Sequence, residues 1–472
     1  MENRKDKTRG KVSKKKLVKK KAAPTVPELS VIDPNVAGID VGSRSHFVAV
    51  PADRSESPVW EYSSFTESLY EMADWLKSCR ITKVAMESTG VYWIALYDIL
   101  EIQGFEVTLV NARHVKNVSG RKSDVLDCQW IQQLHSFGLL KGAFRPERAT
   151  VALRSVVRTR ENLVRGQSHQ IQLMQRAYAE MNMPLQNVLS DIAGMSGMAI
   201  TRAIVAGERN PDALAALCDG RVHATAEEVG GAFQGEWLPE HLLALECALG
   251  IYDAYSQRVA ACDRTIEEML EAMARHPVPE KKSPVVRHTR NTPRFDVQTA
   301  LVQMAGVDLT AIDGIGLNTA MVILSEVGCD LSKFPSGKHF ASWAGVAPGT
   351  RITGGKVISG RIPKSHNRVG QALRLAASSL KHSHSALGAY YRRQCARLGK
   401  KSGIVATAHM LAPDRLCSPD PRTGVRGRRP EGLRGDPEEA GAPGPRTPGQ
   451  RNGVCTHARS GGLISLKKGE KP

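Results

Sequence analysis

The sequence predicts an α/β domain, then a long helical, coiled-coil-like region, then a mostly helical C-terminal domain, with disordered segments at both ends. Three observations carry this prediction. Strand-like and helix-like patterns alternate between residues 34 and 148, as they do in α/β domains. An uninterrupted helical pattern without Pro runs from Arg154 to Met181. The last segment, 412–472, lacks Phe, Trp and Tyr and therefore cannot build a core.

The composition is that of a globular protein with a polyanionic partner. The apolar fraction is 41% and the charged fraction 24%, and no apolar run is long enough to span a membrane. The nine Cys form no CxxC pair and no signal-peptide core precedes them, which favours a reduced, cytoplasmic setting. A formal net charge of +18 favours nucleic acid as the partner.

The first 33 residues form a basic arm. Residues 4–21 contain eleven Lys or Arg, including the run KKKLVKKK. The arm is either a solubilising tail or a segment that binds phosphates without sequence preference. Both alternatives predict disorder in the absence of a partner.

The α/β domain is predicted over residues 34–148. Its first segment, VAGIDVGSRSHFVAV, alternates like a strand, bends at Gly42-Ser43 and resumes as a second strand. The elements that follow are a strand, a helix that ends at a Gly, and a further strand: KVAMEST (83–89), VYWIALYDILEIQG (91–104) and FEVTLVNA (105–112).

Residues 149–276 are predicted to be helical. The helix from Arg154 to Met181 has apolar residues every three or four positions, so we expect it to pack on a partner helix within the chain or in a dimer. Residues 277–299 are rich in Pro and basic residues and indicate a linker or mobile loop. The compact C-terminal domain follows over residues 300–411.

The tail, residues 412–472, has nine Pro and eleven Gly in 61 residues, which predicts disorder. The change in composition is abrupt and comes directly after the helical stretch GIVATAHMLA. We hypothesise that a frameshift near codon 412 replaced a helical C-terminus.

Four acids lie at element ends in the first domain. Asp40 ends a strand core in GIDVGS and Glu87 ends another in AMESTG, while Asp124 and Asp127 share one face if their segment is helical. Carboxylates at strand ends of an α/β sheet point into the crevice where such folds bind ligands. If several converge, they need a divalent cation, and Mg²⁺ prefers oxygen ligands. Two such ions could stabilise the attacking and leaving oxygens of a phosphoryl transfer.

Simpler explanations exist for each acid taken alone. Asp124 could be a first-turn acid favoured by the helix dipole, with Ser123 as N-cap. An Asp at a strand end is often a turn former.

The order of these motifs resembles the RuvC-like DEDD transposases of the insertion-sequence 110 family. The matching stretches span about residues 34–411: GIDVGSRSH, AMESTGVYW, VNARHVKNVSGRKSDVLDCQWI and WAGVAPGTRITGGKVISGRIPK. The resemblance implies a RuvC/RNase H-like α/β domain. It makes the four acids the magnesium-binding DEDD tetrad: Asp40, Glu87, Asp124 and Asp127.

Two basic residues beside these acids, Lys116 and Lys122, would then contact DNA or RNA phosphates, with simple solvation as the alternative. In the C-terminal domain, IDGIGLNTAMVILSEVG (312–328) suggests a helix-hairpin-helix element. Its residues Gly314 and Gly316 would expose backbone N–H groups to a phosphate. A plain helix-turn-helix packing unit is the alternative.

The resemblance also implies a nucleophile. Relatives carry a serine just before a pair of glycines, and it is thought to attack DNA and form a phosphoserine link. The matching residue here is Thr353, in RITGGK, with Ser359 as a nearby alternative. Three basic residues would hold phosphates and stabilise developing charge: Lys356, Arg361 and Lys364. The alternative is that Thr353 is merely a turn residue.

The favoured hypothesis is a transposase that cleaves and rejoins DNA strands with Mg²⁺ to mobilise its insertion sequence. By resemblance, its partners are the DNA of element ends and target, a structured guide RNA, and further copies of itself in a dimer or tetramer. One alternative is a RuvC-like structure-specific nuclease, such as a junction resolvase, with water as nucleophile. Another is a nucleic-acid-binding protein without catalysis.

Overall fold

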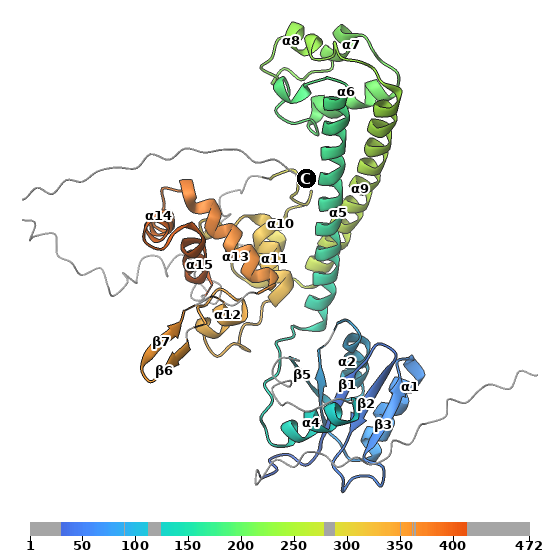
Figure 1. The fold of residues 1–472 in the computed structure, drawn as a ribbon, viewed down its shortest axis with the longest axis vertical. Coiled ribbons are helices and arrows are strands. Elements are labelled where there is room, and N and C mark those ends of the chain that lie inside the picture. The colour runs from blue at the N-terminus through green and yellow to red at the C-terminus, as the bar shows by residue number, and fades with distance from the viewer. Residues whose placement is uncertain are drawn as a thin grey trace, which may run out of the picture. The chain divides into compact units, whose positions relative to one another are not determined.

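The computed structural model describes residues 30–88, 90–111, 124–277, 288–349, 351–360, 362 and 365–412 (Figure 1). Nearly all of the C-terminal tail and of the basic arm lies outside these residues, as do residues 278–287 of the predicted linker. Five residues singled out from the sequence also lie outside them: Lys116, Lys122, Ser123, Arg361 and Lys364. None of the helices described is both long and apolar enough to cross a membrane.

The first domain is built on a five-stranded mixed sheet with the strand order β3-β2-β1-β4-β5. The central strand β1 is parallel to β4, and β4 is parallel to β5, whereas β2 is antiparallel to both β1 and β3. The bounds of the strands are Val36–Val41 (β1), Ser45–Ala49 (β2), Val59–Ser63 (β3), Lys83–Glu87 (β4) and Glu106–Val110 (β5). The predicted α/β domain is therefore confirmed, and β3 is a strand that the sequence analysis did not identify.

Helices cover both faces of this sheet. The helices α1 (Thr66–Ser78) and α2 (Trp93–Ile102) pack on the face that carries Ile39 and Met86. The opposite face, which carries Ala85, is covered by α4 (Asp124–Ser136). Since side chains alternate along a strand, the residues after Ile39 and Met86, which are Asp40 and Glu87, face the α4 side.

The helix α4 lies unusually close to β1 because Gly38 has no side chain. A Cβ atom at Gly38 would lie 2.2 Å from the backbone N of Gln132 and 2.4 Å from the backbone O of Cys128. These are backbone atoms of α4, so the helix would have to move to accommodate any larger residue. Gly38 thus sets the distance between α4 and the strand that ends in Asp40.

The predicted long helix is α5 (Arg148–Glu180), and its partner is α9 (Pro239–Ala272) of the same chain, which runs beside it (Figure 1). A buried ion pair between Arg160 and Asp263 joins the two helices. The ring of Tyr255 lies over Gly166, where an added Cβ would be 2.6 Å from the ring. The partner helix expected for α5 is therefore found within the same chain.

Short helices pack against the far ends of α5 and α9 around a core that contains Tyr178 and Phe233. Their bounds are Leu185–Asn187 (η1), Met195–Val205 (α6), Pro211–Ala215 (α7) and Ala226–Gly231 (α8). Other parts of α5 and α9 contribute Leu153 and Ile266 to the core of the C-terminal region.

The C-terminal region is mostly helical, as predicted. Its helices are Val297–Ala305 (α10), Leu309–Ala311 (η2), Leu317–Val327 (α11), Gly337–Trp343 (α12), Arg368–Ser379 (α13), Leu380–His382 (η3), Ala386–Leu398 (α14) and Lys400–Leu411 (α15). A Gly-rich segment lies between α12 and α13. It forms a two-stranded antiparallel hairpin of β6 (Arg351–Thr353) and β7 (Lys356–Ser359).

We expect Gly38→Ala to destabilise the protein by about 1–3 kcal/mol, the usual cost of overpacking, because its Cβ would overlap the backbone of α4. The measurement is the free energy of unfolding from denaturant titration. The matched control is Gly250→Ala in α9, where no atom lies within 4 Å of the added Cβ. That change should stabilise the helix by up to about 1 kcal/mol. Equal effects of the two changes would contradict the role assigned to Gly38.

Candidate active site

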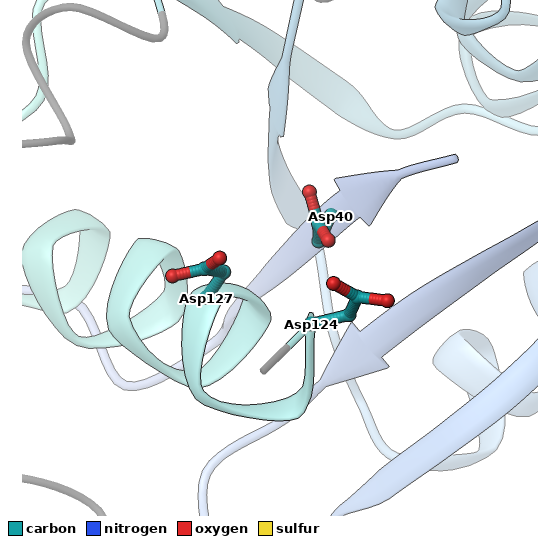
Figure 2. Close-up of side chains that lie close together, drawn as sticks. All are labelled: Asp40, Asp124 and Asp127. Atoms are coloured by element: carbon teal, nitrogen blue, oxygen red, sulfur yellow. The ribbon is translucent and has the colours of Figure 1, made fainter. Parts of the chain in front are cut away.

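Three of the predicted acids form a compact group. Single carboxylate oxygens of Asp40, Asp124 and Asp127 all lie within 4.8 Å of one another. Figure 2 shows them gathered where the first turns of α4 meet the end of β1. Asp124 is exposed, whereas Asp40 and Asp127 are half-buried. The group is therefore held by two rigid elements and stays open to solvent on one side.

The donor set fits a small divalent cation. Mg²⁺ binds oxygen at about 2.1 Å, so opposite ligands lie about 4.2 Å apart, and it usually keeps several waters. Carboxylate oxygens within 4.8 Å of one another need only small side-chain rotations to reach that geometry. The exposed side leaves room for water and a phosphate oxygen.

The same acids affect the pKa of Cys128, a neighbouring residue in α4. Burial raises the pKa of the Cys128 thiol, and the negative charges of Asp40 and Asp127 raise it further. The thiol donates to the backbone O of Val125 at 3.2 Å. Cys128 thus stays protonated and serves as packing between α4 and the sheet, so we do not count it as a metal ligand.

Glu87 lies beside this group but outside it. Ile39 of β1 is paired with Met86 of β4, so the next residues, Asp40 and Glu87, are neighbours on adjacent strands and share a face. Glu87 is buried, with 7% of its surface exposed. The structure therefore brings three of the four predicted acids within one ion's reach and puts the fourth on the adjoining strand end.

The position of Asp124 also agrees with the simpler explanation. It is the first residue of α4, and both Asp124 and Asp127 are first-turn acids, which the helix dipole favours. The dipole alone does not explain why Asp127 approaches Asp40. That approach follows from the close contact of α4 with β1 at Gly38.

Thr353 lies at the tip of the β6–β7 hairpin. The two turn residues, Gly354 and Gly355, have φ values of 54° and 75°, and this left-handed pair is the requirement of a type I′ turn. Thr353 is directly opposite Lys356, and both side chains are exposed. Directly opposed residues point to the same side of a hairpin, with Cβ atoms about 5 Å apart. The side chain of Lys356 therefore lies on the same side of the hairpin as the Thr353 hydroxyl, directly across from it.

Ser359 occupies a different place. It is paired with Arg351 at the open end of the hairpin, away from the Gly-Gly turn, and it is half-buried. The structure thus separates the two candidate nucleophiles, with Thr353 at the tip and Ser359 at the base.

The segment 312–328 contains a turn followed by α11. Gly314 has φ 89°, and a Cβ there would lie 2.6 Å from the backbone O of Ala376 in α13. Gly316 caps α11, and its Cβ position is open. Gly314 is therefore packed against α13, as expected for a structural turn. Gly316 is accessible, as expected for a phosphate-binding turn.

The sequence analysis did not identify a buried ionic cluster around Glu326 of α11. Arg158 donates two hydrogen bonds of 2.7 Å to the Glu326 carboxylate, and Arg154 donates to its backbone O at 2.6 Å. Arg368, the first residue of α13, lies 3.6 Å from the same carboxylate. This cluster ties α13 and α11 to α5. No local spacing signals it, because its members are distant in sequence.

Comparison with known proteins defines the class. Residues 37–181 match a family model of DEDD type described as "Transposase", and residues 306–392 match one described as "Transposase IS116/IS110/IS902 family". The first match contains all four acids, and the second contains Thr353.

A relative in Streptomyces coelicolor, "Insertion element IS110 uncharacterized 43.6 kDa protein", is 39% identical over 90 residues. That alignment covers 19% of this chain and about a fifth (22%) of the relative. Both family matches stand in the order that the motifs predicted, and together with this relative they support an IS110-family transposase.

We expect divalent cations to stabilise the protein through Asp40, Asp124 and Asp127. Saturating Mg²⁺ or Mn²⁺, at about 100 times its dissociation constant, should add about 2.7 kcal/mol to the free energy of unfolding. Asp127→Asn should remove most of this gain. Without metal, the same variant should be more stable than the wild type by roughly 1 kcal/mol, because one charge repulsion is removed.

The measurement is chemical unfolding with and without the cation. Asp53→Asn is the control, since the Asp53 side chain is 74% exposed. If Asp127→Asn gains as much stability from the cation as the wild type does, this group is not the metal site.

Proposed function

We propose that this protein is a transposase that cleaves and rejoins DNA strands to move its insertion sequence, using Mg²⁺ bound at the acidic group. The observation that carries the proposal is the convergence of Asp40, Asp124 and Asp127, with Glu87 on the adjoining strand end, in a chain of this family. We further propose that the sheet and α4 form a RuvC/RNase H-like domain. The mixed strand order, with acids at the ends of β1 and β4, supports it.

The acids would have distinct roles. Asp40 and Asp127 are half-buried and would fix the position of the cation, while the exposed Asp124 would complete the ligand set on the solvent side. Glu87 could reach the same region from β4. Bound Mg²⁺ would supply a Lewis acid that polarises a phosphate oxygen and neutralises charge developing in the transition state. Without a cation, these carboxylates would repel the DNA backbone.

Thr353 is the proposed nucleophile. Its Oγ would form a bond to phosphorus while the P–O bond to the leaving strand breaks, and the hydroxyl proton would be transferred to the leaving oxygen through solvent or a base. The reverse reaction with another strand's hydroxyl group rejoins DNA without an external energy source. Lys356, directly across the hairpin, would hold a non-bridging phosphate oxygen of the same group.

The proposed partners are the DNA of the element ends and target, a structured guide RNA, and further copies of the chain in a dimer or tetramer. The DNA partner is supported by the family matches and by the net charge of +18. The guide RNA and the oligomer rest on the family resemblance. The helix α5 packs on α9 of the same chain, so the length of this helix does not by itself support a second copy.

A structure-specific nuclease is the second candidate function. It is favoured by the threonine at the position of the family's serine, since the extra methyl group of Thr353 crowds an in-line attack. Such an enzyme would use the acidic group alone, with water as nucleophile, and would leave free strand ends.

We expect Asp127→Asn to reduce Mg²⁺-dependent strand cleavage by about 10²–10⁴-fold, since losing metal-assisted charge stabilisation costs several kcal/mol and each 1.36 kcal/mol is tenfold in rate. The assay is single-turnover cleavage of DNA that carries the element ends, with the Asp53→Asn variant as control. Cleavage by Asp127→Asn at the wild-type rate would contradict a catalytic role for the acidic group.

We expect a covalent protein–DNA adduct on denaturing gels that disappears in Thr353→Ala and persists in Ser359→Ala. Thr353→Ser should form the adduct at least as fast as the wild type, because it keeps the hydroxyl and removes the methyl group. Loss of the adduct in Ser359→Ala alone would make Ser359 the nucleophile. Free strand ends from Thr353→Ala at the wild-type rate would favour the nuclease.

A further inference from the structure

The positive charge of this chain is concentrated in two segments. Residues 4–21 carry a net charge of +10, and residues 331–412 contain fourteen Lys or Arg and no Asp or Glu. All other residues together have a net charge of −6, the difference between +18 for the chain and the +24 of these segments. The structure describes most of the second segment, which spans α12 to α15.

Within this segment, four exposed cations lie in the last turns of α14 and the first turn of α15. Arg393 and Arg397 are four residues apart and therefore lie on one face of α14. The chain turns at Gly399, which has φ 80°, and Lys400 and Lys401 begin α15. All four side chains are exposed. We call these residues the α14–α15 basic surface.

Across the described residues, no carboxylate forms an ion pair with any of these four side chains. Arg397 donates to the amide oxygen of Gln394 at 2.9 Å, and the Arg393 guanidinium lies 5.8 Å from the ring centre of Tyr390. The elements packed against α14 and α15 include η3 and α13, which contain no acid either. Arg368, by contrast, is paired with Glu161.

This arrangement has an energetic cost when no anion is present. Like charges at i and i+4 on a helix repel each other and destabilise it, and the dipole at the start of α15 disfavours Lys400 and Lys401. A polyanion would remove both penalties. The spacing suits one, since Arg393 and Arg397 are about 6 Å apart along the helix axis and a duplex presents about three to four phosphates over that length.

We propose that the α14–α15 basic surface binds the phosphate backbone of duplex DNA without reading its sequence. The inference rests on the proposed function, which requires the protein to hold DNA, and it assigns that role to residues outside the acidic group and the hairpin.

Duplex DNA is favoured over single-stranded RNA by the aromatic content of the surface. Proteins that recognise unpaired RNA stack its bases on exposed aromatic rings. The aromatic residue next to these cations is Tyr390, which is half-buried and lies next to the Arg393 guanidinium. Among the described residues here, the cations are exposed whereas the neighbouring ring is half-buried, which suits phosphates better than bases.

The test compares two double variants with equal loss of charge. Arg393→Gln with Arg397→Gln changes the basic surface, while Arg258→Gln with Arg264→Gln changes two exposed arginines of α9. Binding of the full-length protein to a DNA duplex is followed by fluorescence anisotropy between 50 and 200 mM salt, without divalent cations so that no cleavage occurs. A single-stranded RNA of equal length is titrated in parallel.

We expect the slope of log K against log salt to fall by about 1.8 in the surface variant, because each side chain that neutralises a phosphate contributes about 0.9 to the slope. Adding Lys400→Gln and Lys401→Gln should bring the total decrease to about 3.6. The control should change the slope by less than about 0.5. Thermal unfolding midpoints that match the wild type would show that the variants are folded.

The inference is overturned if the surface and control variants lower the DNA slope equally, or if only RNA binding weakens. The binding test of the basic surface is independent of the cleavage test of the proposed function. Asp127→Asn should lose cleavage and yet bind DNA with the wild-type slope or a steeper one. If the wild type does not cleave DNA while the surface variant shows the expected decrease in slope, the transposase activity is refuted and the surface stands.

Discussion

The candidate active site depends on one close contact, that of the α4 backbone with β1 at Gly38. A side chain there would lie 2.2 Å from the helix backbone, so only glycine lets α4 lie this near the strand. Asp40 is two residues further along the strand and faces the same helix. The contact thereby brings Asp40 to Asp127, with Asp124 one turn earlier. Backbone packing, more than side-chain flexibility, sets the geometry of the three carboxylates.

The proposed nucleophile is held quite differently. The β6–β7 hairpin has only three and four residues in its strands, and Ile352 and Ile358 are each more than 60% exposed. A two-stranded hairpin without packing is marginally stable in water. The helix that follows it is well anchored, because Arg368 belongs to the Glu326 cluster that ties α13 to α5. A rigidly held acidic group and an exposed hairpin would suit the proposed reaction, in which the DNA strand itself would complete the alignment.

Single helices and strands could be predicted from the sequence, whereas contacts between residues far apart in the chain could not. Alternation located β1, β2, β4 and β5, and helical spacing located α2 and α5, because each pattern lies within a single element. The pairing of α5 with α9, the Glu326 cluster and the contact at Gly38 unite residues about 40 to 170 positions apart, and no window along the chain reveals them. The hairpin had a local signal in Gly354-Gly355, but its strands were too short to show a period.

The cations that could bind DNA and the acids that could bind a metal lie in different parts of the chain. The α/β domain, residues 34–148, contains fourteen Asp or Glu and twelve Lys or Arg, so it has no net attraction for a polyanion. Its acidic group would repel a phosphate until a cation is bound. The cations that could hold DNA are concentrated in residues 4–21 and in the segment 331–412, the second of which has no acid. Under the proposed function, DNA binding would not require the metal, whereas cleavage would. A protein with this separation of charges would bind its substrate before a cation is present and would cut it only after the cation has neutralised the acidic group.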